Sequence, residues 1–174
     1  MKTLNTFLIS ALAYLIISCS GSPEITSSSK PNKFLNKIDR IAVVPSKIGN
    51  PDDLVLPDAL ETELLNLGLN LVDRTSVRQM VSEKGLDFTE ILNGEEYFKL
   101  GKIVDIKNII IVNSRLGTDG VSSASLKVID LENNEIILSV TYSQPSPNNP
   151  TYVHFQNINT TAKEMTKPLS TIIK

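Results

Sequence analysis

Cys19 is the only cysteine in the 174 residues, and it stands directly behind a short apolar run. A single thiol excludes a disulfide framework, so packed side chains must hold the fold together. The chain has no Trp and few aromatic residues, whereas Ile, Leu and Val are frequent. This composition favours an aliphatic core of the kind found in α/β domains.

The start of the chain has the order of a bacterial lipoprotein signal. Lys2 supplies a positive start, an apolar stretch runs from Phe7 to Ile17, and Ile16-Ile17-Ser18-Cys19 has the form of a lipobox. The apolar stretch is about half of the ~20 residues with which a helix spans a bilayer. We therefore predict that residues 1–18 are a signal peptide and that Cys19 becomes a lipidated N-terminus. An ordinary secretory signal and a buried core helix are the alternatives.

Acyl chains on Cys19, palmitate included, anchor a protein to a membrane because each buried CH₂ contributes about 0.8 kcal/mol. Ser20 follows Cys19 in place of the Asp that often marks retention in the inner membrane. We expect a lipid-anchored protein of the cell envelope, at the outer membrane and facing the periplasm, with the inner membrane left open. The formal net charge is −2 and no basic stripe is visible, so we expect no nucleic-acid partner.

The rest of the chain divides into a linker and one domain. Residues 19–36 are rich in Ser, Pro and Lys and poor in apolar groups, which predicts a flexible linker. Such a linker of ~17 residues reaches at most ~60 Å when fully extended. Residues 37–174 have the length of one ordinary domain, and we find no internal repeat.

The first half of this domain alternates between apolar runs and helical patterns. Arg40–Pro45 resembles a buried strand, and Leu69–Asp73 resembles a second strand. A helix is expected between them, because Leu56, Leu60, Leu64 and Leu67 share one face and Gly68 follows as a cap. Ser76 and Gln79 suggest a capping box for a helix that ends near Gly85, and a third helix is expected over residues 94–104.

The second half is richer in strands. Asn108–Asn113 predicts a central strand, and Val121–Leu131 with Glu135–Ser143 predicts a hairpin that turns at Asn133-Asn134. Apolar residues from Phe155 to Ile172 fit an amphipathic terminal helix, which Pro168 should kink or divide. We therefore predict a single α/β domain with a mixed four- to five-stranded sheet flanked by helices, a late antiparallel hairpin and a C-terminal helix.

Groups for catalysis are sparse. His154 is the only histidine, so no zinc site can be assembled from His and Cys, and no Gly-x-Ser-x-Gly elbow supports a catalytic serine. Three carboxylate pairs fit helix starts or an exposed helix face, where acids are ordinary: Asp52/Asp53, Glu61/Glu63 and Glu95/Glu96. We expect no enzyme, no metal and no cofactor.

Several stretches between residues 40 and 143 resemble the CsgG family, the curli production assembly domain. That family is related to the penicillin-binding-protein activator lipoproteins and to the N-terminal domain of TolB. The matching pieces, in order, are Arg40–Pro45, Leu71–Arg74, Leu100–Lys102, Ile109–Val112, Ser125–Asp130 and Glu135–Ser139. The family usually has Gly-Ala where Asp105-Ile106 stand, and Gly where Asn113 and Asn134 stand. A pair between Arg74 and Glu83 is conceivable, or both residues are merely exposed.

The resemblance implies a non-enzymatic interaction module that supports secretion or assembly of envelope structures. The main alternative is an activator of a peptidoglycan synthase, as in the related activator lipoproteins. A third hypothesis is an oligomeric secretion-channel component, possible as a homo-oligomer. The loops near Ser46–Asp53 and Ser143–Tyr152 are too short for added membrane-spanning hairpins, which argues against a pore. The expected partners are the membrane, through the lipid, and envelope proteins whose identity stays open.

Overall fold

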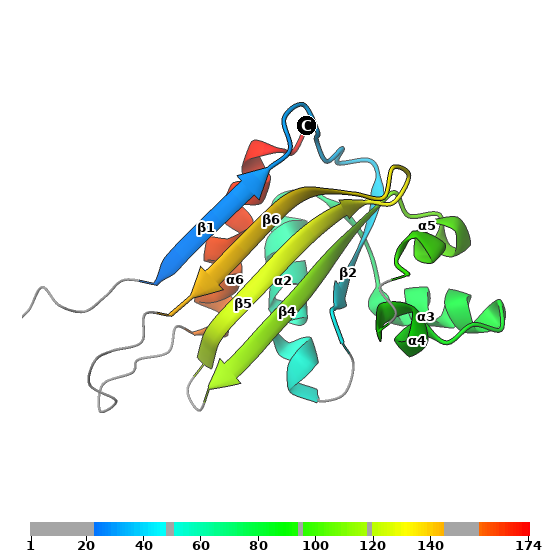
Figure 1. Ribbon diagram of the computed structural model, residues 1–174, viewed down its shortest axis with the longest axis horizontal. Coiled ribbons are helices and arrows are strands. Elements are labelled where there is room, and N and C mark those ends of the chain that lie inside the picture. Colours follow the sequence, from blue (N-terminus) through cyan, green and yellow to red (C-terminus); the bar gives the residue numbers. More distant parts are fainter. Residues whose placement is uncertain (1–22, 48–50, 94–95, 118–119, 145–156) are drawn as a thin grey trace, which may run out of the picture.

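The computed structural model describes residues 23–47, 51–93, 96–117, 120–144 and 157–174, and within them one mixed sheet organises the domain (Figure 1). Its six strands follow the order β1-β6-β5-β4-β2-β3. Their bounds are β1 Glu24–Ser29, β2 Arg40–Pro45, β3 Asn70–Val72, β4 Asn108–Gly117, β5 Gly120–Asp130 and β6 Glu135–Ser143. The α/β class, the single domain and the mixed sheet are confirmed, with more strands than predicted.

The sheet joins parallel and antiparallel halves as predicted. β2 pairs in parallel with both β3 and β4, whereas β4 with β5 and β5 with β6 pair antiparallel. The predicted hairpin is present, and Asp130 lies opposite Glu135 at its turn. Asn134 in this turn has a φ of 53°, and Asp105 before β4 has a φ of 52°. Glycine adopts this left-handed conformation most readily, and both are positions where the resembled family carries glycine.

The helices cover the sheet unequally. The helical segments are η2 Pro51–Leu54, α2 Val55–Asn66, α3 Arg74–Glu83, α4 Phe88–Asn93, α5 Phe98–Val104, α6 Ile158–Thr166 and η4 Lys167–Thr171. Figure 1 shows α2 and α6 behind the sheet and α3 to α5 beside β2. One apolar core lies between the sheet and α2 with α6, and a second, smaller core joins α3, α4 and α5 to β2 and β4.

The segment expected to be a flexible linker contains a strand, so that prediction is wrong for residues 24–29. β1 pairs antiparallel with β6 along its whole length, from Glu24 opposite Ser143 to Ser29 opposite Leu138. Leu35, also in the expected linker, is fully buried in the larger core and exchanges backbone hydrogen bonds with Ile172 and Lys174. The folded domain therefore begins before residue 37.

Two local predictions change, one open alternative is decided, and one prediction holds. The capping box at Ser76 is wrong, because the cap of α3 is Asp73, whose side chain accepts the Ser76 N–H at 2.9 Å. The third helix begins at Phe98 and is preceded by the separate helix α4. Of the two alternatives left open for Arg74 and Glu83, their pairing is not formed, as described below. Pro168 does divide the terminal helix, since α6 ends at Thr166 and a 3₁₀ segment follows.

Candidate interaction surface

Strand alternation gives the sheet two different faces. Leu126 and Val140 point toward α2 and α6, and their neighbours along the strands point to the other side. On that side the described helices α3 to α5 cover only part of the sheet, and β1, β6, most of β5 and the end of β4 lie outside their cover (Figure 1). We call this the open face, and its side chains are Glu24, Thr26, Ser28, Asn113, Arg115, Ser123, Ser125, Lys127, Ser139, Thr141 and Ser143.

The open face is polar but nearly uncharged over much of its area. Hydroxyl side chains dominate β1, β5 and β6, and the exposed cations Lys127 and Arg115 lie on its β4–β5 side. Short hydroxyl side chains lose little rotamer freedom on contact, and they both donate and accept hydrogen bonds. Such a surface suits contact with another macromolecule.

A hollow of about 460 Å³ lies where the open face meets α4 and α5. Its apolar lining consists of Leu92, Tyr97, Ile111, Ile129 and Ile136. Its polar lining consists of Ser46, Lys47, Asn113, Ser125, Lys127 and Asn134. The described lining residues include no Asp or Glu, so among them an aliphatic floor is combined with a positive rim.

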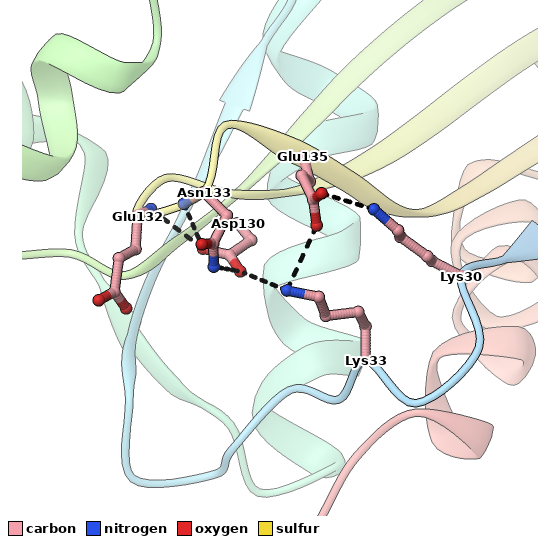
Figure 2. A network of polar contacts seen from close by, with 6 residues as sticks. All are labelled: Lys30, Lys33, Asp130, Glu132, Asn133 and Glu135. Carbon is pink, nitrogen blue, oxygen red and sulfur yellow. Dashed lines mark hydrogen bonds and ion pairs between the residues drawn. The ribbon is translucent and has the colours of Figure 1, made fainter.

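An ion-pair network ties the end of β1 to the β5–β6 turn (Figure 2). Lys30 Nζ lies 2.6 Å from Glu135 Oε1, and Lys33 Nζ lies 3.3 Å from Glu135 Oε2 and 3.5 Å from Asp130 Oδ2. Hydrogen bonds to Lys30 and Lys33 hold the pKa of Glu135 below its ordinary value. A hydrogen bond to Glu135 raises the pKa of Lys33. These pairs fix the loop after β1 against the turn.

Asp130 organises the turn itself. Its Oδ1 accepts the backbone N–H groups of Glu132 and Asn133, and its Oδ2 accepts the Asn133 side-chain amide at 2.7 Å. Burial alone would raise the pKa of Asp130, but these hydrogen bonds outweigh burial and leave the pKa below its ordinary value. Both carboxylates of the network are therefore engaged and charged at neutral pH.

A second ion-pair cluster, around Arg74, holds two helices together. Arg74 donates to Asp58 at 2.5 Å and to Glu61 at 3.0 Å, which links the start of α3 to α2. Burial lowers the pKa of Arg74, but the two carboxylates more than compensate and raise it above its ordinary value. One of the carboxylate pairs noted in the sequence thus serves helix packing through Glu61, and the pairing of Arg74 with Glu83 that the sequence left open is not formed.

Those of the other residues singled out from the sequence that the structure describes do not converge on one place. Cys19 and His154 lie outside the described residues, and so does Glu95. Asp52 and Asp53 lie in η2, and Glu96 forms an ion pair with Lys99. Within the described ranges no group of three His, Cys, Asp or Glu side chains could hold a metal ion, and no helix there is long and apolar enough to cross a membrane.

Comparison with known proteins shows which solved structures have a similar fold. No family model and no curated protein matches the chain. The PelC dodecamer from Paraburkholderia phytofirmans superimposes with a TM-score of 0.51 at 12% identity, over 88% of this chain and 99% of that chain. The LpoB C-terminal domain from Salmonella enterica gives a TM-score of 0.51 at 13% identity, over 64% of this chain and 86% of that one. Lipoprotein GNA1162 from Neisseria meningitidis gives 0.49 at 17% identity, over 64% and 84%.

At these identities the similarity shows a shared fold alone. The finer resemblance to the curli production assembly domain stays a prediction. This chain therefore has the α/β fold seen in PelC and in the C-terminal domain of LpoB.

Proposed function

We propose that the protein is a lipid-anchored, non-enzymatic interaction module of the bacterial envelope that binds and activates a peptidoglycan synthase. The observation that carries this proposal is the fold shared with the C-terminal domain of LpoB, a penicillin-binding-protein activator lipoprotein. The lipobox at Cys19 and the uncovered polar sheet face add support, since an activator needs an anchor and a surface for its partner.

The anchor limits where the partner can be met. Four residues separate Cys19 from Glu24, the first residue of β1. This tether reaches at most ~17 Å when fully extended, far less than the linker expected from the sequence. A lipidated Cys19 therefore keeps the sheet close to its membrane, and a synthase partner has to bring its own binding domain to that surface.

Glycan polymerisation by a purified synthase from the same bacterium tests the proposal. We expect the rate to rise when the lipidated protein is added in detergent micelles. A Ser125→Glu variant, altered on the open face, should lose most of the effect, and a Lys163→Glu variant on α6 should keep it. An unchanged polymerisation rate with the unaltered protein, across synthases of that bacterium, would refute the proposal.

A second candidate is an oligomeric assembly component. The PelC structure described as a dodecamer matches 88% of this chain and 99% of its own length, which is the wider of the two fold matches. Light scattering of the lipidated protein in detergent separates the two candidates. A mass of about one chain favours the activator, and ring-sized particles favour the assembly component.

A further inference from the structure

The hollow beside α4 and α5 carries an unbalanced positive charge. Lys47 follows β2, and Lys127 lies in the middle of β5. Both are exposed, and within the described residues neither of them forms an ion pair. By contrast, Lys30 and Lys33 at the nearby turn are both paired with carboxylates.

The described carboxylates closest along the chain to the hollow's lining are Glu96, Asp130 and Glu135, and all three are already engaged; Glu96 pairs with Lys99. Asn134 and Ile136 line the hollow and flank Glu135, but Glu135 pairs with Lys30 and Lys33. Asp130 follows the lining residue Ile129, and its oxygens accept three hydrogen bonds from the turn. Among the described residues the two lysines at the rim therefore have no paired counter-charge, and an anion from outside is the complementary ligand.

The floor of the hollow restricts what kind of anion fits. Ile111 and Ile129 are buried at its base, and the Ile136 side chain is 50% exposed at its edge. Branched aliphatic side chains pack against aliphatic groups, whereas sugar rings prefer flat aromatic surfaces, and Tyr97 is the one aromatic side chain among the described lining residues. The side-chain amides of Asn113 and Asn134 add donors and acceptors of the type that match a peptide backbone.

We propose that this hollow binds an acidic, aliphatic peptide segment of a partner protein. A carboxylate lies between Lys47 and Lys127, and a neighbouring Leu, Ile or Val side chain covers Ile111, Ile129 and Ile136. The inference rests on the proposed function in that it names the part of the partner that is recognised. Peptide binding to the hollow is measured separately from synthase activation, because activation can persist through other contacts of the open face.

The test uses the full lipidated chain in detergent micelles and a fluorescein-labelled peptide of alternating Glu and Leu. Fluorescence anisotropy measures the affinity of the protein for this peptide. The same peptide with Gln in place of Glu is the uncharged control. We expect the double variant Lys47→Glu/Lys127→Glu to weaken binding about tenfold or more, since two exposed charge pairs become repulsive. The control Lys84→Glu/Lys163→Glu changes the net charge equally at exposed lysines outside the hollow and should bind as the parent does.

Two further measurements complete the test. Ile136→Ser should weaken binding without unfolding the domain, which circular dichroism checks, and raising the salt concentration should weaken binding of the Glu peptide only. The proposal is overturned if the control double variant binds the Glu peptide as weakly as the hollow variant does, or if the Gln peptide binds as well as the Glu peptide. It is also overturned if an acidic sugar chain, an oligogalacturonate, binds and loses its binding in the hollow variant while the Glu peptide does not bind. An intact effect on the synthase in any of these cases leaves the proposed function standing.

Discussion

The structure makes Leu35 part of the core rather than of a linker, and a single substitution tests this. The Leu35 side chain is fully buried, and its backbone donates to Ile172 at 2.7 Å and accepts from Lys174 at 2.9 Å. Replacing a buried leucine by alanine costs about 2–5 kcal/mol, because the transfer free energy is lost and a cavity remains. Since small domains are stable by ~5–15 kcal/mol, Leu35→Ala removes a large part of that stability.

Urea unfolding followed by circular dichroism measures the effect, and Ile38→Ala is the matched control. The Ile38 side chain is 78% exposed only three residues further along, so its truncation should change the free energy of unfolding by less than ~0.5 kcal/mol. If Leu35→Ala costs no more than Ile38→Ala, the segment is not packed in solution and the linker interpretation is the correct one.

Three further predictions concern the cap of α3, the β1–turn network and the anchor. Asp73→Ala should destabilise the domain by about 1 kcal/mol and Ser76→Ala by clearly less in thermal unfolding, because Asp73 caps the helix; equal losses would contradict this. The folded-state pKa values of Asp130 and Glu135 lie below the ordinary 3.8 and 4.5, so their contribution to stability is complete above those values and is lost as the pH falls through the folded-state values. A Glu135→Gln variant should therefore lose less stability than the parent between pH 6 and pH 3, and an identical pH profile would exclude the network. Cys19→Ala should abolish labelling by palmitate and membrane retention, and a processed variant that still partitions with membranes would refute the single lipid anchor.

Much of the fold was accessible from the sequence because its buried elements carry strong periodic patterns. The apolar runs of β2 and β4 and the leucine face of α2 identified a parallel βαβ start, and Asn133-Asn134 located the hairpin. Pro168 marked the division of the terminal helix because it cannot continue the backbone hydrogen bonding.

β1 was missed for a physical reason. It is an edge strand of sequence EITSSS in which only Ile25 packs on the core, so it carries almost no hydrophobic signal. Its stability comes from backbone pairing with β6, a segment far away in the sequence. Local composition therefore indicates a linker where long-range pairing forms a strand.

The candidate surface was missed because strand order alone creates it. Lys47 and Lys127 come from distant segments and meet only because β4 lies between β2 and β5. The register shift in the β5–β6 pair also leaves Ile136 half-exposed while Ile137 is buried, which simple alternation does not reveal. The one available signal was the run of Ser and Thr on one side of two neighbouring strands.

Photo-crosslinking in living cells tests the central claim most directly. A p-benzoylphenylalanine at Asn113, which lines the hollow on the open face, is compared with one at Lys163, which is exposed on α6 behind the sheet. Mass spectrometry identifies what each position captures. We predict that position 113 captures a peptidoglycan synthase and that position 163 does not. Capture of the synthase from position 163 alone, or only copies of this chain from position 113, would contradict the account.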